Sequence, residues 1–203
     1  MNEYQQKEAQ EKADRARFNA NNARLKAIIN PLRQSTYSCD VDWRRMQGAL
    51  DRYAEDYGSV ELNPDFQRGH VWTEAQQIHY VENALRGIVA QTAFVIQLNC
   101  PNWENDDYQG ELPRGMQCID GLQRLTAIQR LMAGDIKPFG LSLEDLEYSS
   151  FSLKGVSYRF RIEMFTFQTR AELLKHYLDL NTGGTPHSAD EIERVKRLLE
   201  ETK

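Results

Sequence analysis

The sequence predicts an α+β domain in which a small mixed sheet packs against helices. Residues 158–164 alternate between apolar and charged side chains, as a half-buried strand does. Other segments repeat their apolar residues at the helical period, and strands and helices follow one another without a regular β-α-β alternation. The 203 residues are 40% hydrophobic and 10% aromatic, which is enough for one core.

The first 34 residues are predicted to form a charged helical extension ahead of a domain at residues 35–203. Apolar residues are sparse until Leu25, and Pro31 marks the end of the helix. Through Arg33 the segment holds seven basic and four acidic residues, although the whole chain has a net charge of −5. Two interpretations stay open: an arm that touches nucleic acid or a partner, and a solvated helix or oligomer contact, which the composition favours.

The first half of the domain predicts three strands and two helices. The strands are expected at 35–41, 60–62 and 93–99 and the helices at 43–57 and 73–86. Gly58 and Gly87 follow the two helices, where glycine commonly ends a helix. Residues 101–115 are polar and acidic, and we expect them to form a solvated loop.

The second half predicts two more strands and three helices. The strands are expected at 116–119 and 158–164 and the helices at 122–132, 171–180 and 189–200. Capping boxes, in which two side chains bond each other's backbone at a helix start, support four of the helices. The pairs are Thr73/Gln76, Asp120/Gln123, Thr169/Glu172 and Ser188/Glu191.

Several classes of protein are excluded by composition. No apolar run approaches the ~20 residues of a membrane span, and the N-terminus is too polar for a signal peptide, so we expect a cytoplasmic protein without membrane contact. Cys39, Cys100 and Cys118 form no C-x-x-C pair and are interpreted as reduced, buried thiols. The four histidines have no metal-site spacing, and we expect no protein-held metal. The negative net charge argues against a protein that coats nucleic acid, but it permits a local basic patch.

The segment Asp120-Gly121-Leu122-Gln123-Arg124 lies where a short strand turns directly into an amphipathic helix. Backbone N–H groups at such a turn suit anions, and Arg124 adds a permanent positive charge. The same residues also suit a plain helix start, because Asp120 is a good N-cap and stands four residues before Arg124. The spacing alone leaves a capped helix and a phosphate site equally open.

Two further segments carry polar residues on predicted loops. Residues 63–72 lead into a helix and include Gln67 and Arg68, which can donate to phosphate or to a base edge, beside aromatic residues that can anchor the loop in the core. The residues alone favour the second role, in which the aromatic side chains anchor the loop in the core. Residues 181–186 begin with Asn181 and hold paired glycines, which permit either a phosphate nest or an ordinary interhelical loop, the commoner case.

Taken in order, the three segments resemble the N-terminal domain of GmrSD-type modification-dependent restriction endonucleases, within the ParB/sulfiredoxin-like superfamily. That domain shows a Pro-x-(Phe/Tyr)-Gln-Arg-x-(Tyr)-x-Trp segment, an Asp-Gly-Gln-Gln-Arg segment and a later Asn-x-x-Gly-x-Pro-Leu segment. Here they correspond to 64–72, 120–124 and 181–187. The resemblance covers roughly residues 35 to 200 and implies a compact ParB/sulfiredoxin-like α+β fold.

The resemblance also implies a stand-alone domain that binds and hydrolyses a nucleoside triphosphate with Mg²⁺, in restriction, anti-restriction or phage–host conflict. By match of position, the catalytic candidates are Asp120 and Arg124, and the phosphate-binding candidates are Gln67, Arg68, Gly121, Gln123, Arg124 and Asn181. Arginines at such a site stabilise developing phosphoryl charge. The expected partners are a nucleotide and, beyond it, DNA or a nuclease or defence protein, with oligomers formed through the N-terminal helix.

Departures from the family pattern keep a second hypothesis open. Leu122 replaces the first Gln of the Asp-Gly-Gln-Gln-Arg segment, while His70 and His187 stand where Tyr and Leu are usual. Leu122 separates a binding interpretation from a catalytic one, and the alternative is a non-catalytic DNA-binding or inhibitor module of the same fold. We expect no autonomous DNA cleavage, because the separate nuclease module of full-length relatives has no counterpart here. A nuclease built on Asp120 and Glu163 is disfavoured, because no paired-carboxylate spacing is visible.

Overall fold

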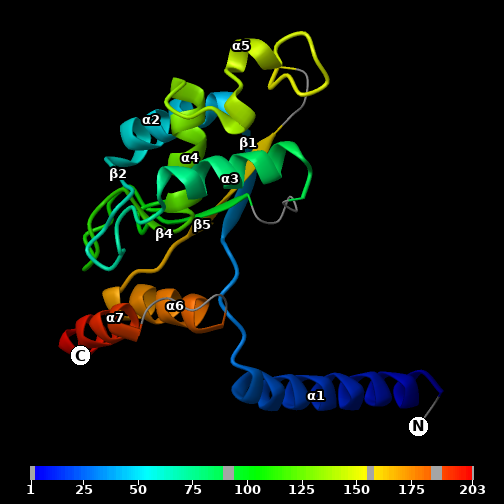
Figure 1. Cartoon of the computed structure of the whole chain (residues 1–203). Coiled ribbons are helices and arrows are strands. Elements are labelled where there is room, and N and C mark those ends of the chain that lie inside the picture. The colour runs from blue at the N-terminus through cyan, green and yellow to red at the C-terminus, as the bar shows by residue number, and fades with distance from the viewer. Residues whose placement is uncertain (1–2, 89–93, 155–157, 184–188, 203) are drawn as a thin grey trace. The chain divides into compact units, whose positions relative to one another are not determined.

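The computed structural model describes residues 3–88, 94–154, 158–183 and 189–202, and the chain divides into two compact units, Met1–Arg33 and Gln34–Lys203. The first unit contains one helix, α1 (Glu3–Ile29), coloured dark blue in Figure 1. Nearly all of its described side chains are exposed. A helix that is polar all round buries no face of its own. Asn30 then takes a positive φ of 46° directly before Pro31, so the helix ends where the sequence predicts.

The second unit is built on a mixed, open sheet of five strands (Figure 1). The strands are β1 (Tyr37–Asp42), β2 (Val60–Glu61), β3 (Val95–Asn99), β4 (Met116–Asp120) and β5 (Arg159–Phe165). Their order across the sheet is β1-β5-β3-β4-β2. The pairs β1/β5 and β3/β4 are antiparallel, whereas β3/β5 and β2/β4 are parallel. The predicted α+β class with a small mixed sheet is therefore confirmed.

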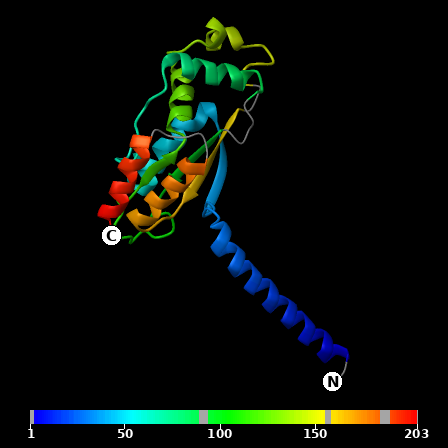
Figure 2. The ribbon, with the colours of Figure 1, turned by 60° about the horizontal axis from the view of Figure 1, so that its bottom comes forward.

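Helices cover both faces of this sheet (Figure 2). They are η1 (Trp43–Arg45), α2 (Met46–Tyr57), α3 (Glu74–Leu85), α4 (Leu122–Ala133), η3 (Pro138–Gly140), α5 (Leu143–Leu146), α6 (Arg170–Gly183) and α7 (Ala189–Glu201). Apolar residues of α2, α3 and α4 form the larger core cluster, and those of α6 and α7 form a second cluster. Strand alternation separates the two, because Cys118 belongs to the first cluster and its neighbour Ile119 to the second.

The helix starts follow the predicted caps only in part. Thr73 and Gln76 form the full capping box of α3. At α6, Thr169 accepts a hydrogen bond from the Glu172 N–H at 3.3 Å, but the Glu172 carboxylate accepts from Gln168 instead of Thr169. The Ser188/Glu191 pair depends on Ser188, which lies outside the described residues.

Two short helices, η3 and α5, were not predicted. At α5 the side chains of Ser142 and Asp145 form a capping box, so the pattern Ser-x-x-Asp was the available signal. Among the helices described here, none is long and apolar enough to cross a membrane.

Candidate functional site

The turn between β4 and α4 is shaped by a single glycine. Gly121 has a φ of 104°, a left-handed conformation that favours glycine, and it is the residue that precedes α4. A Cβ added to Gly121 would lie 2.8 Å from the Val95 carbonyl oxygen and 3.0 Å from the Ile96 Cα atom. The turn therefore lies directly against the backbone of β3, and position 121 accepts no larger residue without movement.

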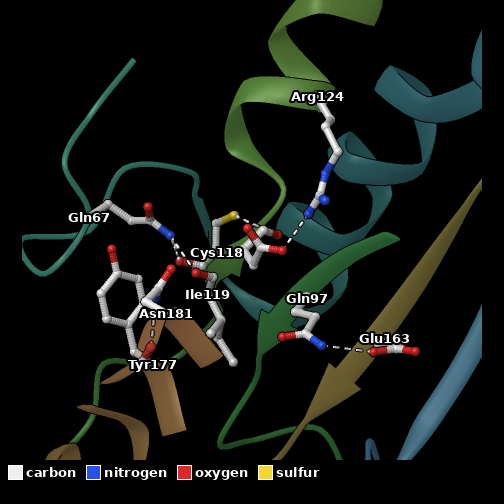
Figure 3. Close-up of polar contacts among 9 residues, drawn as sticks. Gln67, Gln97, Cys118, Ile119, Arg124, Glu163, Tyr177 and Asn181 are labelled. Carbon is white, nitrogen blue, oxygen red and sulfur yellow. Dashed lines mark hydrogen bonds and ion pairs between the residues drawn. The ribbon is translucent and has the colours of Figure 1, made fainter. Parts of the chain in front are cut away.

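Asp120 does not cap the helix, so the predicted Asp120/Gln123 capping box is wrong. Asp120 is the last residue of β4, and Gly121 takes the N-cap position without a side-chain hydrogen bond. The Asp120 carboxylate instead accepts a hydrogen bond from Arg124 Nη2, and the two form an ion pair (Figure 3). The predicted i, i+4 pair is thus confirmed. The side chain of Asp120 is 54% exposed and that of Arg124 is 23% exposed.

Gln123 attaches a neighbouring loop to the start of α4. Its Oε1 atom accepts hydrogen bonds from the Val71 and Trp72 N–H groups, both at 3.0 Å. Its Nε2 atom donates to the Gly69 carbonyl at 2.7 Å. These three bonds to backbone groups explain why a glutamine suits position 123 without reference to any ligand.

Gln67 makes a similar attachment to the end of β4. Its Nε2 atom donates to the carbonyl oxygens of Cys118 at 3.0 Å and Ile119 at 2.6 Å (Figure 3). Arg68 is exposed and stands between Gln67 and Gly69, the two residues whose groups are bonded to β4 and α4. The backbone of Arg68 is therefore held beside the β4–α4 turn.

The same loop is held from the other side by α7. Arg194 donates to the carbonyl oxygens of Asp65, Phe66 and Gln67, the last two at 2.9 and 3.0 Å. The sequence did not predict this role of Arg194. An arginine on an amphipathic helix carries no local signal that it bonds a loop 128 residues away.

Asn181 lies on a helix and not in the predicted loop. Helix α6 continues to Gly183, and the Asn181 Nδ2 atom donates to the Tyr177 carbonyl at 2.7 Å, one helical turn earlier (Figure 3). Helix α6 thus includes Asn181, although asparagine commonly favours turns. The Tyr177 ring packs against the Phe66 ring with centroids 5.4 Å apart, so the end of α6 lies against the loop that holds Gln67. Residues 184–186 of the predicted nest lie outside the described residues.

Three polar atoms around the turn are buried and lack a hydrogen-bond partner within the described part of the chain. They are Arg124 Nε, Tyr80 Oη and Gln97 Oε1. Burial raises the pKa of Tyr80, and the positive charge of Arg124 opposes that rise, so these two groups are near each other. Gln97 Nε2 donates to Glu163 at 3.0 Å (Figure 3). Buried polar groups normally have a partner, so this region has spare hydrogen-bonding capacity.

The chemistry of the turn suits a phosphorylated ligand more than a metal held by protein alone. Within the residues described, no group of three or more His, Cys, Asp or Glu side chains could hold a metal ion. Mg²⁺, however, commonly needs only one or two carboxylates beside the phosphates of a substrate, and Asp120 supplies one exposed carboxylate. Leu122 is 8% exposed and packs in the larger core cluster, so its side chain is not presented at the exposed part of the turn.

Comparison with known proteins gives one finding. The sequence model of the family described as "GmrSD restriction endonuclease, N-terminal domain" matches residues 46–181. The matched range includes the loop at 64–72, the β4–α4 turn and Asn181. No match was found among curated proteins or among solved structures.

Proposed function

The chain belongs to the family of GmrSD restriction endonuclease N-terminal domains, and from this premise we propose that it binds the phosphates of a nucleoside triphosphate at the β4–α4 turn. The family sets the protein in the context of restriction and phage defence. The ParB/sulfiredoxin-like architecture belongs to the same proposal. It is supported by a small mixed sheet in which a strand turns directly into a helix at the glycine of the family motif.

The observation that carries the proposal is the position of Arg124. Arg124 is in the first turn of α4, where backbone N–H groups and the helix dipole already favour an anion. Its Nη2 atom is bonded to Asp120, while its buried Nε atom has no partner in the described residues. A phosphate oxygen would satisfy this donor once the Arg124 side chain turns away from Asp120 and exposes it. Arg68, whose backbone is fixed beside the turn, would supply a second cation.

Asp120 and Arg124 would act together during hydrolysis. Bound Mg²⁺ would neutralise phosphate charge, and Asp120 would be its protein ligand. Arg124 would exchange its bond with Asp120 for bonds to the phosphate, where a guanidinium stabilises the charge that develops during phosphoryl transfer. Because the ion pair is partly exposed, this exchange would cost little, since such pairs contribute about 0–1 kcal/mol.

Nucleotide titration tests the proposal. The full chain is titrated with ATP, GTP, CTP and UTP, with and without Mg²⁺, and compared with Arg124→Ala, Arg68→Ala and the control Arg197→Ala. Arg197 is exposed on α7 and takes part in none of the contacts described at the turn, so its replacement removes the same charge without breaking them. We expect binding of at least one nucleotide that Arg124→Ala weakens tenfold or more and Arg197→Ala leaves unchanged. No binding, or equal binding by Arg124→Ala, would refute the proposal.

A second function is favoured by a different observation. The Nε2 atoms of Gln67 and Gln123 and the Nδ2 atom of Asn181 all donate to backbone carbonyls, so these amides already serve the fold. A domain that keeps these contacts without turnover would be a non-catalytic DNA-binding or protein-interaction module. Salt-dependent DNA binding that weakens when residues 1–30 are deleted supports this alternative. Robust nucleoside triphosphate turnover by the purified chain counts against it.

A further inference from the structure

A groove lies between β1 and α2. It has a volume of about 590 Å³, and its lining includes Arg44, Arg45, Arg52, Arg159, Asp40 and Asp42. In the sheet, β1 is separated from β4 by β5 and β3. Three strand spacings amount to roughly 14 Å, so this groove and the β4–α4 turn are different places on the unit.

The acidic residues of the groove are already matched by arginines. Asp42 accepts hydrogen bonds from the Nε and Nη2 atoms of Arg44, both at 3.0 Å. Asp40 pairs with Arg161 at 3.2 Å, and Arg161 is not part of the lining. Arginines therefore outnumber aspartates in a groove whose aspartates are neutralised, although the chain as a whole has a net charge of −5.

Arg45 and Arg52 supply the surplus charge. Both are exposed, and within the described residues neither forms an ion pair. Arg45 precedes α2 and Arg52 is two turns further, so with Ala49 between them they lie on one face of the helix. Ala49 is itself buried and forms part of the groove lining. Asp56 follows one turn beyond Arg52 but does not line the groove.

The spacing of the two arginines indicates the kind of anion. Seven residues of helix separate their Cα atoms by roughly 10 Å along the axis. Arginines this far apart can each contact a separate phosphate, and a chain of phosphodiesters presents negative charge along its whole length. Pockets for small molecules are mostly apolar, and this groove is lined largely by charged side chains.

We propose that the β1–α2 groove binds consecutive phosphates of a nucleic acid strand through Arg45 and Arg52. Guanidinium groups suit this role, because each presents a rigid fork of donors that matches phosphate oxygens. The groove has no residue in common with the β4–α4 turn. The proposal for the groove and the proposal for the nucleotide site can therefore be refuted independently.

Oligonucleotide binding by the full chain tests the groove. Fluorescence anisotropy is measured with a labelled 20-nucleotide single strand, and with the duplex of the same sequence, over a series of salt concentrations. The variants are Arg45→Ala/Arg52→Ala, the charge-preserving Arg45→Lys/Arg52→Lys, and the control Arg197→Ala. Both groove residues are exposed and outside the core, and thermal unfolding of each variant checks that the fold is intact.

We expect the double alanine variant to bind the oligonucleotide at least tenfold more weakly. Its plot of log K against log salt should lose about two units of slope, one for each phosphate contact removed. The lysine variant should retain most of the affinity, because lysine still contacts phosphate as a point charge. The Arg197→Ala control should bind like the unmodified chain.

Three results would overturn the proposal. The first is no oligonucleotide binding by the unmodified chain, and the second is equal affinity and slope in the double alanine variant. The third comes from titration with inorganic tripolyphosphate. If the double alanine variant loses tripolyphosphate binding but keeps the oligonucleotide, the groove is a site for small polyphosphates and not for a strand.

Discussion

The β4–α4 turn and the β1–α2 groove both gather arginines, but they use polar side chains in opposite ways. At the turn, Gln67 and Gln123 bond backbone groups of neighbouring elements, and Arg124 is paired with Asp120. In the groove, Arg45 and Arg52 form no ion pair within the described residues. Many residues of a family motif can therefore be required by the fold. A charged surface that carries no motif can leave more of its side chains available to a ligand.

Replacing Gly121 with alanine should give the largest effect on stability. The new Cβ would meet the Val95 carbonyl oxygen at 2.8 Å while the backbone keeps a φ of 104°. Strain and overpacking together should cost roughly 2–5 kcal/mol. Chemical unfolding of Gly121→Ala measures this cost.

Gly48→Ala is the matched control for that substitution. Gly48 is inside α2, and a Cβ there would have nothing within 4 Å. Alanine should stabilise the chain there by roughly 0.5–1 kcal/mol, as it does within helices generally. Equal effects of the two substitutions would contradict the close approach of the turn to β3.

Replacing Gln123 with alanine should release the loop at 69–72. The Val71 and Trp72 N–H groups and the Gly69 carbonyl would each lose a partner, at a total cost of roughly 1–3 kcal/mol. Hydrogen exchange at residues 71 and 72 should become faster. Gln129→Ala, which breaks an exposed bond to Gln47, is the control and should leave that exchange unchanged.

Asp120→Asn should separate the contribution of the Asp120–Arg124 pair to stability from its contribution to nucleotide binding. Loss of a partly exposed ion pair should change stability by at most about 1 kcal/mol. Without Mg²⁺, the released Arg124 should bind nucleotide about two- to fivefold more tightly, which corresponds to the same energy. With Mg²⁺, turnover should fall, since Asp120 is the proposed metal ligand. Weaker binding without Mg²⁺ would mean that Asp120 does not compete for Arg124.

The smallest expected effect is at low pH and concerns Asp42. Hydrogen bonding by the Arg44 side chain lowers the pKa of Asp42 from its ordinary value of 3.8. A lowered pKa in the folded state means that the stabilisation is present above about pH 3.8 and is lost as the pH falls through the folded pKa.

Asp42→Asn tests this contribution, because asparagine can keep the capping bond to the Arg44 N–H without the charge. Unfolding free energies of the two proteins should differ by up to about 1 kcal/mol at pH 6, and the difference should shrink as the pH falls through the lowered pKa of Asp42. A difference that stays constant over this range would show that the carboxylate charge contributes nothing.

The sequence predicted most of the fold because the relevant signals are local. Apolar periodicity predicted the strands of the sheet and the helices that pack on it. The capping pair Thr73 and Gln76 predicted the start of α3. Asp120 was misjudged as a cap because residue type cannot reveal that β4 continues through it and that Gly121 takes the N-cap position.

Contacts between distant segments were not predictable in the same way. Arg194 donates to carbonyl groups more than a hundred residues away, and the groove combines arginines of η1 and α2 with Arg159 of β5. The motifs lie on segments that meet in the structure, because Gln67 bonds the end of β4 and Tyr177 of α6 packs against Phe66 of the same loop. They could not distinguish the amides that hold the loop from the charged groups left for a ligand.

A crystal structure of the full chain with a non-hydrolysable nucleoside triphosphate and Mg²⁺ tests the central claim most directly. We predict a phosphate oxygen within hydrogen-bonding distance of Arg124 Nε and the first N–H groups of α4, with Asp120 facing the metal. Nucleotide bound only in the β1–α2 groove, or an Asp120–Arg124 pair that persists with no phosphate beside it, would contradict the account.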